Sequence, residues 1–154
     1  MIVPLIITAA GMFFFYARIN LVYTFTGVIL AHVALATPFV VITVTATLVG
    51  FDMNMVKAAQ SLGAKPMRTF FKVIMPLILP GIISGALFAF ITSFDEVVIV
   101  MFMASIDQLT IPKQMWAGIR QEISPVILCM ATCLVILSIV LLTTVELLRR
   151  RAER

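Results

Sequence analysis

The sequence predicts an all-α protein, a polytopic bundle of transmembrane helices, and three observations support this fold class. Hydrophobic residues make up 62% of the 154 residues and charged residues only 12%, whereas soluble domains carry about half apolar and about a quarter charged residues. The apolar residues stand in long blocks rather than at the spacing of an amphipathic helix or strand. The basic residues gather between and after these blocks. The composition therefore excludes a globule that is soluble in water.

Four apolar blocks are candidates for membrane spans. A bilayer core of about 30 Å requires roughly 20 apolar residues in a helix. The first block is marginal in length, and no Lys or Arg precedes it, which makes a cleaved signal peptide the weaker interpretation. We expect about four spans, near Ile2–Ala17, Gly27–Val49, Ile82–Met103 and Val126–Leu148.

The basic residues predict the orientation of the chain. Eight lie on one side, between the second and third blocks and after the fourth, and three lie on the other. The positive-inside rule places the richer side, with the loop near residues 51–76 and the C-terminus, in the cytoplasm of a multi-pass membrane protein. The net charge of +4 is thereby explained by topology, and nucleic acid is not expected as a partner. The eight are Lys57, Lys65, Arg68, Lys72, Arg149, Arg150, Arg151 and Arg154, and the three are Arg18, Lys113 and Arg120.

The loop between the second and third blocks predicts two helices joined by a tight turn. Asp52 is a good N-cap for a short helix over Met53–Leu62. Gly63 suits the left-handed position that ends it, and Pro66 suits the first turn of the next helix. Two further prolines are expected to break the backbone before the third span, namely Pro76 and Pro80.

This loop resembles the cytoplasmic signature of permeases of ABC importers. That signature has an acidic residue, two alanines, a glycine four residues later and a terminal I-x-L-P. The chain has Lys57, Ala58, Ala59 and Gly63 at this spacing, and ends the pattern with V-I-M before Pro76. The resemblance implies that the loop couples to an ATPase. Lys57 departs from the family pattern because it reverses the usual charge.

The flanking segments resemble permeases of the spermidine/putrescine type, and the resemblance covers essentially the whole chain. They read ILAHVALATPFVVITVTATLVGFD, GALFAFITSFDEVVIVMF and IPKQMWAGIRQEISP. The resemblance implies a single permease domain over 1–154, N-terminally truncated, since it matches the last four of six expected spans. It also implies a separate ATPase subunit, a second permease subunit and an extracytoplasmic solute-binding protein. No phosphate-binding loop G-x-x-x-x-G-K-[ST] occurs, so we expect neither an enzyme nor a bound cofactor or metal in this chain.

Polar residues inside the blocks are candidates for a substrate pathway. An ionised carboxylate in a bilayer is costly, so Asp95 and Glu96 should face protein or water. Asp95 shares a helical stripe with Thr92 and with the small residues Gly81 and Gly85, whose spacing lets a neighbouring helix approach. One interpretation is that the acids attract a cationic substrate; the other is an interhelical ion pair or a protonated acid.

The second block offers a matching polar face that contains His32, Thr43 and Thr47. His32 is a packing or interfacial residue in one interpretation and a pathway residue in the other. On the outer side, Thr110 and Pro112 predict the start of a short helix that carries Trp116, either as an interfacial anchor or as a gate or docking surface. Cys129 and Cys133, four positions apart, are expected to be small apolar packing residues and not to form a disulfide.

The leading functional prediction is therefore a permease subunit of an ATP-driven importer for polyamines or another small cation. An ion-coupled secondary transporter would also bury acids but would not need the helix–glycine–helix loop. A membrane assembly protein without transport activity would use Asp95 and Glu96 structurally. An ATPase chain that co-purifies separates the first class from the other two.

Overall fold

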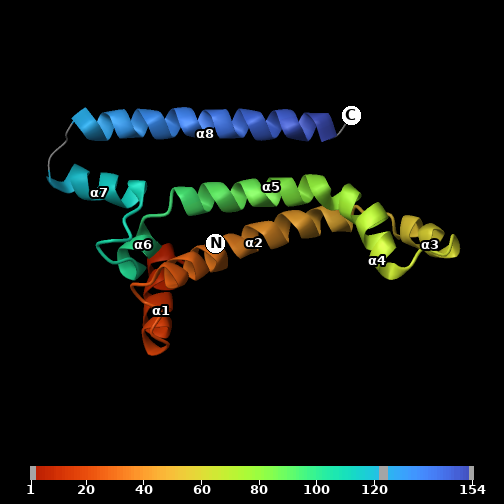
Figure 1. The fold of residues 1–154 in the computed structure, drawn as a ribbon, viewed down its shortest axis with the longest axis horizontal. Coiled ribbons are helices and arrows are strands. Elements are labelled where there is room, and N and C mark those ends of the chain that lie inside the picture. Colours follow the sequence, from red (N-terminus) through yellow and green to blue (C-terminus); the bar gives the residue numbers. More distant parts are fainter. Residues whose placement is uncertain (1–2, 122–124, 153–154) are drawn as a thin grey trace. The chain divides into compact units, whose positions relative to one another are not determined.

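The computed structural model describes residues 3–121 and 125–152, and these residues form helices and turns without a strand. The helical fold class is confirmed. Figure 1 shows the elements in chain order. They are α1 (Leu5–Arg18), α2 (Phe25–Val49), α3 (Met53–Ser61), α4 (Pro66–Thr69), the π-helical turn η1 (Phe70–Ile74), α5 (Met75–Phe94), α6 (Val98–Met103), α7 (Ile111–Gln121) and α8 (Pro125–Ala152).

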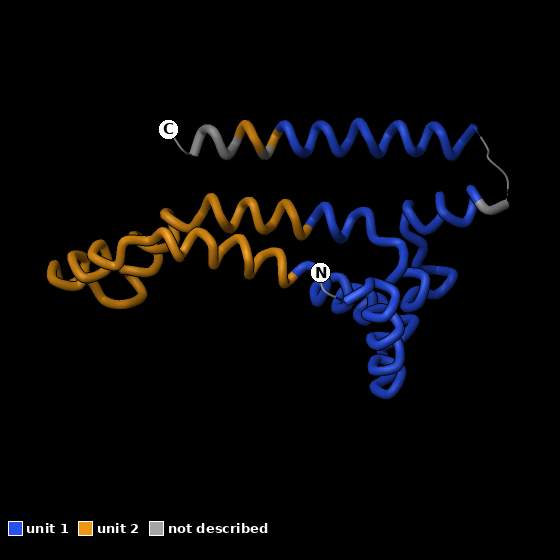
Figure 2. Tube along the Cα trace, turned by 180° about the vertical axis from the view of Figure 1, so that it is seen from behind, with its two compact units in different colours: residues 1–36, 90–143 blue, residues 37–89, 144–154 orange. Residues whose placement is uncertain are grey.

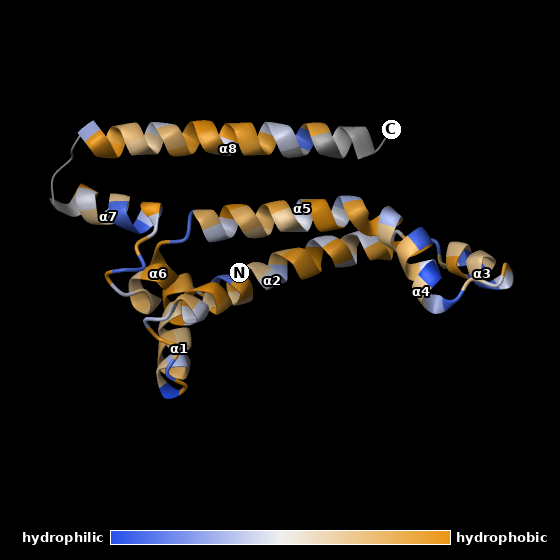
Figure 3. Cartoon of the chain, viewed as in Figure 1, coloured by the Kyte–Doolittle hydropathy of each residue, from blue (hydrophilic) through white to orange (hydrophobic). Residues whose placement is uncertain are grey.

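Three helical stretches in the described residues are long and apolar enough to cross a membrane. They are Phe25–Val49, Pro66–Phe94 and Pro125–Thr144, and their apolar character is plain in Figure 3. The fourth candidate is shorter than expected. At 14 residues and about 1.5 Å of rise per residue, α1 reaches only part of the way across a bilayer core.

The chain divides into two compact units, which Figure 2 distinguishes by colour. The first contains residues 1–36 and 90–143, and its core lies where α1 packs against α6. α2 begins after a Thr24 cap, whose hydroxyl accepts the Gly27 N–H at 3.0 Å. The buried side chains of this core come from α1, α2 and α6, so the short helix α6 is held within the unit. They are Ala9, Tyr16, Ala31, Leu35, Ile99 and Met103.

The second unit contains residues 37–89 and 144–154. Here the C-terminal half of α2 and the N-terminal half of α5 approach closely. A Cβ placed on Gly81 would collide with the Thr47 side chain, and one on Gly85 would collide with that of Thr43. The predicted close approach of a neighbouring helix at Gly81 and Gly85 is confirmed. The threonine side chains of α2 leave room only for glycine at these two positions.

The prolines of α5 do not break the backbone, contrary to our expectation. Pro76 occupies the first turn of α5 and Pro80 lies inside it, and residues 66–94 form one helical stretch. The irregularity comes earlier, in η1, where the Met75 N–H bonds to the Phe70 carbonyl five residues back. The ring of a proline in a helix clashes with the carbonyl four residues earlier, which is here that of Lys72. A widened turn directly before Pro76 relieves that clash.

Candidate functional site

The loop between α2 and α5 has the local structure that its sequence predicts. The Asp52 carboxylate accepts the Asn54 N–H at 2.9 Å and so caps α3. Gly63 ends that helix region with a φ of +78°, a conformation that L side chains rarely adopt. Pro66 is the first residue of α4. The helix–glycine–helix motif is therefore a folded unit, which we call the coupling loop (residues 51–76).

The residues assigned to ATPase coupling differ in exposure. Lys57, Ala58, Gly63 and Pro76 are exposed, whereas Ala59 is half-buried. α3 packs against α4 and η1. Lys57 and Ala58 are thus accessible, whereas Ala59 is partly covered.

Asp95 and Glu96, the two acids predicted for a substrate pathway, lie in a break between helices and not on one continuous span. We expected a helix over 82–103, but α5 ends at Phe94 and α6 begins at Val98. The Asp95 N–H still bonds to the Ile91 carbonyl, at 3.1 Å. An acid is unfavourable at a helix C-terminus and favourable at an N-terminus, so Glu96 is well placed before the start of α6, whereas Asp95 gains no such stabilisation at the end of α5.

The break gives the two carboxylates opposite environments. Asp95 is exposed, whereas Glu96 retains only 5% of its accessible surface. The Glu96 carboxylate accepts the Ile99 N–H at 2.8 Å, which satisfies a backbone donor in the first turn of α6. Glu96 therefore serves the fold, whereas the Asp95 carboxylate is exposed.

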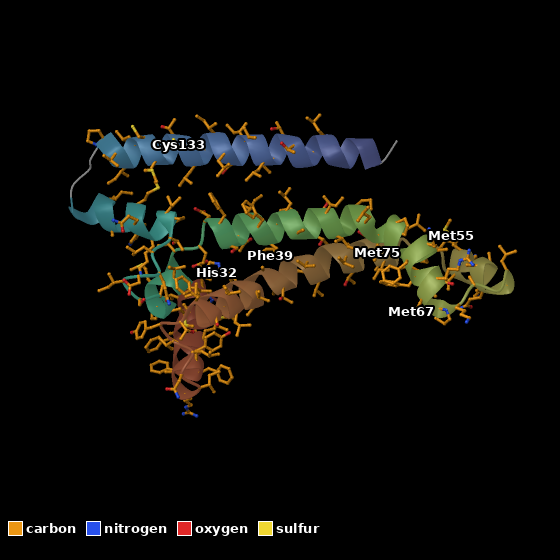
Figure 4. The ribbon with its side chains drawn as sticks, viewed as in Figure 1. His32, Phe39, Met55, Met67, Met75 and Cys133 are labelled. Atoms are coloured by element: carbon orange, nitrogen blue, oxygen red, sulfur yellow. The ribbon has the colours of Figure 1, made fainter. Side chains whose placement is uncertain are left out.

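His32 lies on α2 (Figure 4) and is bonded to the end of α5 within the first unit. Its Nδ1 and the Ser93 hydroxyl are 2.9 Å apart and share a hydrogen bond. Thr92 and His32 are both half-buried. His32 is thus linked to the last turn of α5 through Ser93, a residue that sequence reasoning missed.

Lys113 has a structural role that the sequence analysis also missed. Its ammonium group donates to the carbonyls of Ala104, at 3.2 Å, and Val100, at 3.5 Å. These are C-terminal carbonyls of α6, where a cation is favourable. Glu96 and Lys113 thus hold the two ends of α6. The contact joins residues about a dozen positions apart across a loop, so no periodic spacing in the sequence predicts it.

The short helix predicted at Thr110 and Pro112 begins as expected, because the Thr110 hydroxyl accepts the Lys113 N–H at 3.4 Å at the start of α7. Trp116 is half-exposed on this helix. Ser124 before Pro125 predicts a cap for the last span, and Ser124 lies outside the described residues. The thiols of Cys129 and Cys133 are free and exposed, so they do not form a disulfide.

The whole chain matches one protein family. Residues 1–154 match the model of the binding-protein-dependent transport system inner membrane component. The chain belongs to this family. The resemblance to importer permeases that the coupling loop suggested is thereby confirmed, and the apolar helices are the membrane-spanning part of such a component.

Curated relatives of this inner membrane component are permeases of polyamine transport systems. The chain is 30% identical over 151 residues to the spermidine/putrescine transport system permease protein PotC of Haemophilus influenzae, a match that covers 98% of this chain and 59% of the relative. It is 30% identical to PotC of Escherichia coli K12, over 97% of this chain and 57% of the relative. It is 37% identical over 103 residues to the putrescine permease PotI of Escherichia coli K12, covering 67% of this chain and 37% of PotI.

The inner membrane component described here spans a little under three fifths of the length of the PotC relatives, 59% and 57%. The matched part contains both regions described above, the coupling loop and the α5–α6 break, because the alignments cover nearly all of this chain.

Proposed function

We propose that this chain is the permease subunit of an ATP-driven, binding-protein-dependent importer whose substrate is a polyamine or another small cation. The match of the whole chain to the inner membrane component family carries the proposal. The names of the PotC and PotI relatives support the choice of polyamines. ATP hydrolysis, capture of the solute and the second half of the pathway belong to other subunits.

The coupling loop is the part of the permease that receives the ATPase. Its short helices are capped at Asp52 and turned at Gly63, and its outward side chains, including Lys57 and Ala58, remain exposed. A small rigid helix with an accessible face fits a groove on a partner better than a disordered loop does, because little conformational entropy is lost on binding.

Asp95 is the residue that meets the cation. It is exposed at the break between α5 and α6, whereas the neighbouring Glu96 is already bonded to the backbone. In surroundings of low dielectric constant one carboxylate attracts a cation far more strongly than in water. The half-buried Thr92, and His32 bonded to Ser93, line the adjoining helix ends and complete the polar path.

The coupling loop and the C-terminus face the cytoplasm in this proposal, and the segment around α7 faces outward. The excess of Lys and Arg in the loop and tail supports this orientation. Single cysteines at the exposed positions Ser61 and Asp107, in a background that lacks Cys129 and Cys133, test it. An impermeant thiol reagent in intact cells should label D107C and not S61C, and the reverse pattern contradicts the orientation.

The function is tested by purification of the tagged chain with its bound subunits and their reconstitution in liposomes. We expect an ATPase to co-purify, and radiolabelled spermidine or putrescine uptake to require ATP and the solute-binding protein. Uptake driven by an ion gradient without ATP would identify a secondary transporter instead. ATP-dependent uptake of a neutral solute, with no polyamine uptake, would leave the importer assignment intact and overturn the substrate.

A further inference from the structure

The outward face of the coupling loop combines positive charge with flexible apolar side chains. Four basic side chains of the loop are exposed, and in the described part of the chain none of them takes part in an ion pair. The only carboxylate of the loop, Asp52, caps α3. The four are Lys57, Lys65, Arg68 and Lys72.

Lys57 occupies the centre of the exposed side of α3. Met53 and Ser61 lie one turn before and after it on the same stripe, and both are exposed. The loop also exposes large apolar side chains: Met53 on this stripe is 62% exposed, Leu62 after the end of α3 is 89% exposed, and Met67 on α4 is 69% exposed. Figure 4 labels Met55 and Met67 on the same loop. Methionine adapts its shape to the surface it meets.

We propose that this face, centred on Lys57, docks into an apolar groove of the ATPase subunit that carries a carboxylate opposite Lys57. The proposal rests on the proposed function and adds the chemistry of the partner. An ammonium group that loses water on docking requires an anion or several acceptors, and the loop has no spare carboxylate to supply one. The methionines and Leu62 bury apolar area, and Lys57 selects the partner by charge.

The competing occupant is the anionic surface of the membrane, which also attracts basic and apolar segments. Two observations favour a protein. Within the second unit, α3 lies beyond the adjoining ends of α2 and α5, as Figure 1 shows. The exposed face of α3 also carries the uncharged polar side chains Asn54, Gln60 and Ser61, which interrupt any continuous apolar stripe of the kind that enters lipid.

Carbodiimide cross-linking of the purified complex tests the contact directly, because this reagent joins an amine only to a carboxylate that touches it. We expect a mass-spectrometric cross-link between Lys57 and an Asp or Glu of the ATPase subunit, and its loss in K57Q. An intact complex in which Lys57 links to no carboxylate of the ATPase overturns the proposal.

Binding measurements give a second, independent readout. We expect affinity for the ATPase to fall about tenfold in K57Q and roughly 100-fold in K57E, and reversal of the cross-linked carboxylate to Lys to restore binding to K57E. R18E, an equal change of charge at an exposed site in the other unit, serves as the control and should bind normally.

The remaining outcomes separate the two proposals. One outcome is that K57E binds the ATPase as well as the original chain does, but phosphatidylglycerol nanodiscs no longer stimulate the ATPase activity of the complex. Lys57 would then face lipid, and the charge proposal would be wrong while the importer function stands. If no ATPase co-purifies with the original chain, the proposed function fails, and this inference fails with it.

Discussion

The α5–α6 junction and the coupling loop use charged side chains in opposite ways. At the junction, Glu96 is buried and bonded to the Ile99 N–H, and Lys113 is bonded to the carbonyls at the other end of α6. In the loop, Lys57 and its basic neighbours are exposed and unpaired within the described chain. A charge that already satisfies the backbone contributes to the fold, whereas an exposed one is available to a partner or a solute.

Asp95 is the exception that makes this comparison useful. It stands next to Glu96 in the sequence and yet is exposed. If the comparison is right, loss of Glu96 should affect stability, loss of Asp95 should affect transport, and changes in the coupling loop should affect neither the membrane fold nor the solute path.

The largest effect is expected for E96A. This change leaves the Ile99 N–H without its acceptor in a buried environment, and a buried unsatisfied group costs about 1–3 kcal/mol. The thermal midpoint of the complex in detergent should fall clearly. E96Q keeps an oxygen acceptor and should recover most of the loss. Equal loss in both variants would mean that the fold requires the charge of Glu96 and not only its acceptor oxygen.

A β-branched residue at Gly63 is expected to have the next largest effect, and it is confined to the loop. G63V forces a Val into a left-handed conformation, at a cost of roughly 1–2 kcal/mol. A Cβ at this position meets no atom within 4 Å, so the strain arises from the backbone and not from a clash. Substrate-stimulated ATPase activity should fall while the thermal midpoint of the membrane helices is unchanged. G63N, which tolerates φ > 0 better, is the matched control, and equal defects in both would refute the backbone argument.

These cases also show what the sequence could predict. The caps at Asp52, Gly63 and Pro66 depend on a few adjacent residues, so local rules found them. The approach of α2 to α5 was visible in the spacing of two glycines. The break after Phe94 was not found, because residues 82–103 are apolar enough to pass as one span.

The polar partners of the junction could not be predicted for a different reason. The Ser93 bond to His32 joins residues 61 positions apart, and the contact of Lys113 with α6 depends on the path of a loop. Only the tertiary fold creates such pairs. The prediction of a backbone break at the prolines was wrong for a third reason. Pro76 falls in the first turn of α5, where proline is tolerated.

D95N is expected to lower polyamine uptake about tenfold, equivalent to roughly 1.4 kcal/mol, as the loss of one charge contact with the cation. Asn nearly preserves the shape and keeps a polar group, so the change isolates the charge. The complex should assemble, bind its ATPase and melt as before, because Asp95 is exposed. A complex that no longer assembles would assign Asp95 to an ion pair with another subunit, and unchanged uptake would exclude it as a contact of the cation.

The smallest effect is expected for K113M, which removes the ammonium group at the C-terminus of α6 and keeps most of the side-chain stem. The Ala104 carbonyl then loses a donor at 3.2 Å, and an ordinary hydrogen bond contributes about 1 kcal/mol. The loss should be smaller than for E96A because Lys113 is only half-buried and water can replace it, whereas Glu96 is buried. The thermal midpoint of K113M should fall slightly, and that of K113Q should lie between those of K113M and the original chain. The dependence of uptake on polyamine concentration should not change. An altered concentration dependence would place Lys113 in the solute path, and the distinction between charges that hold the fold and charges that meet the solute would no longer hold at this junction.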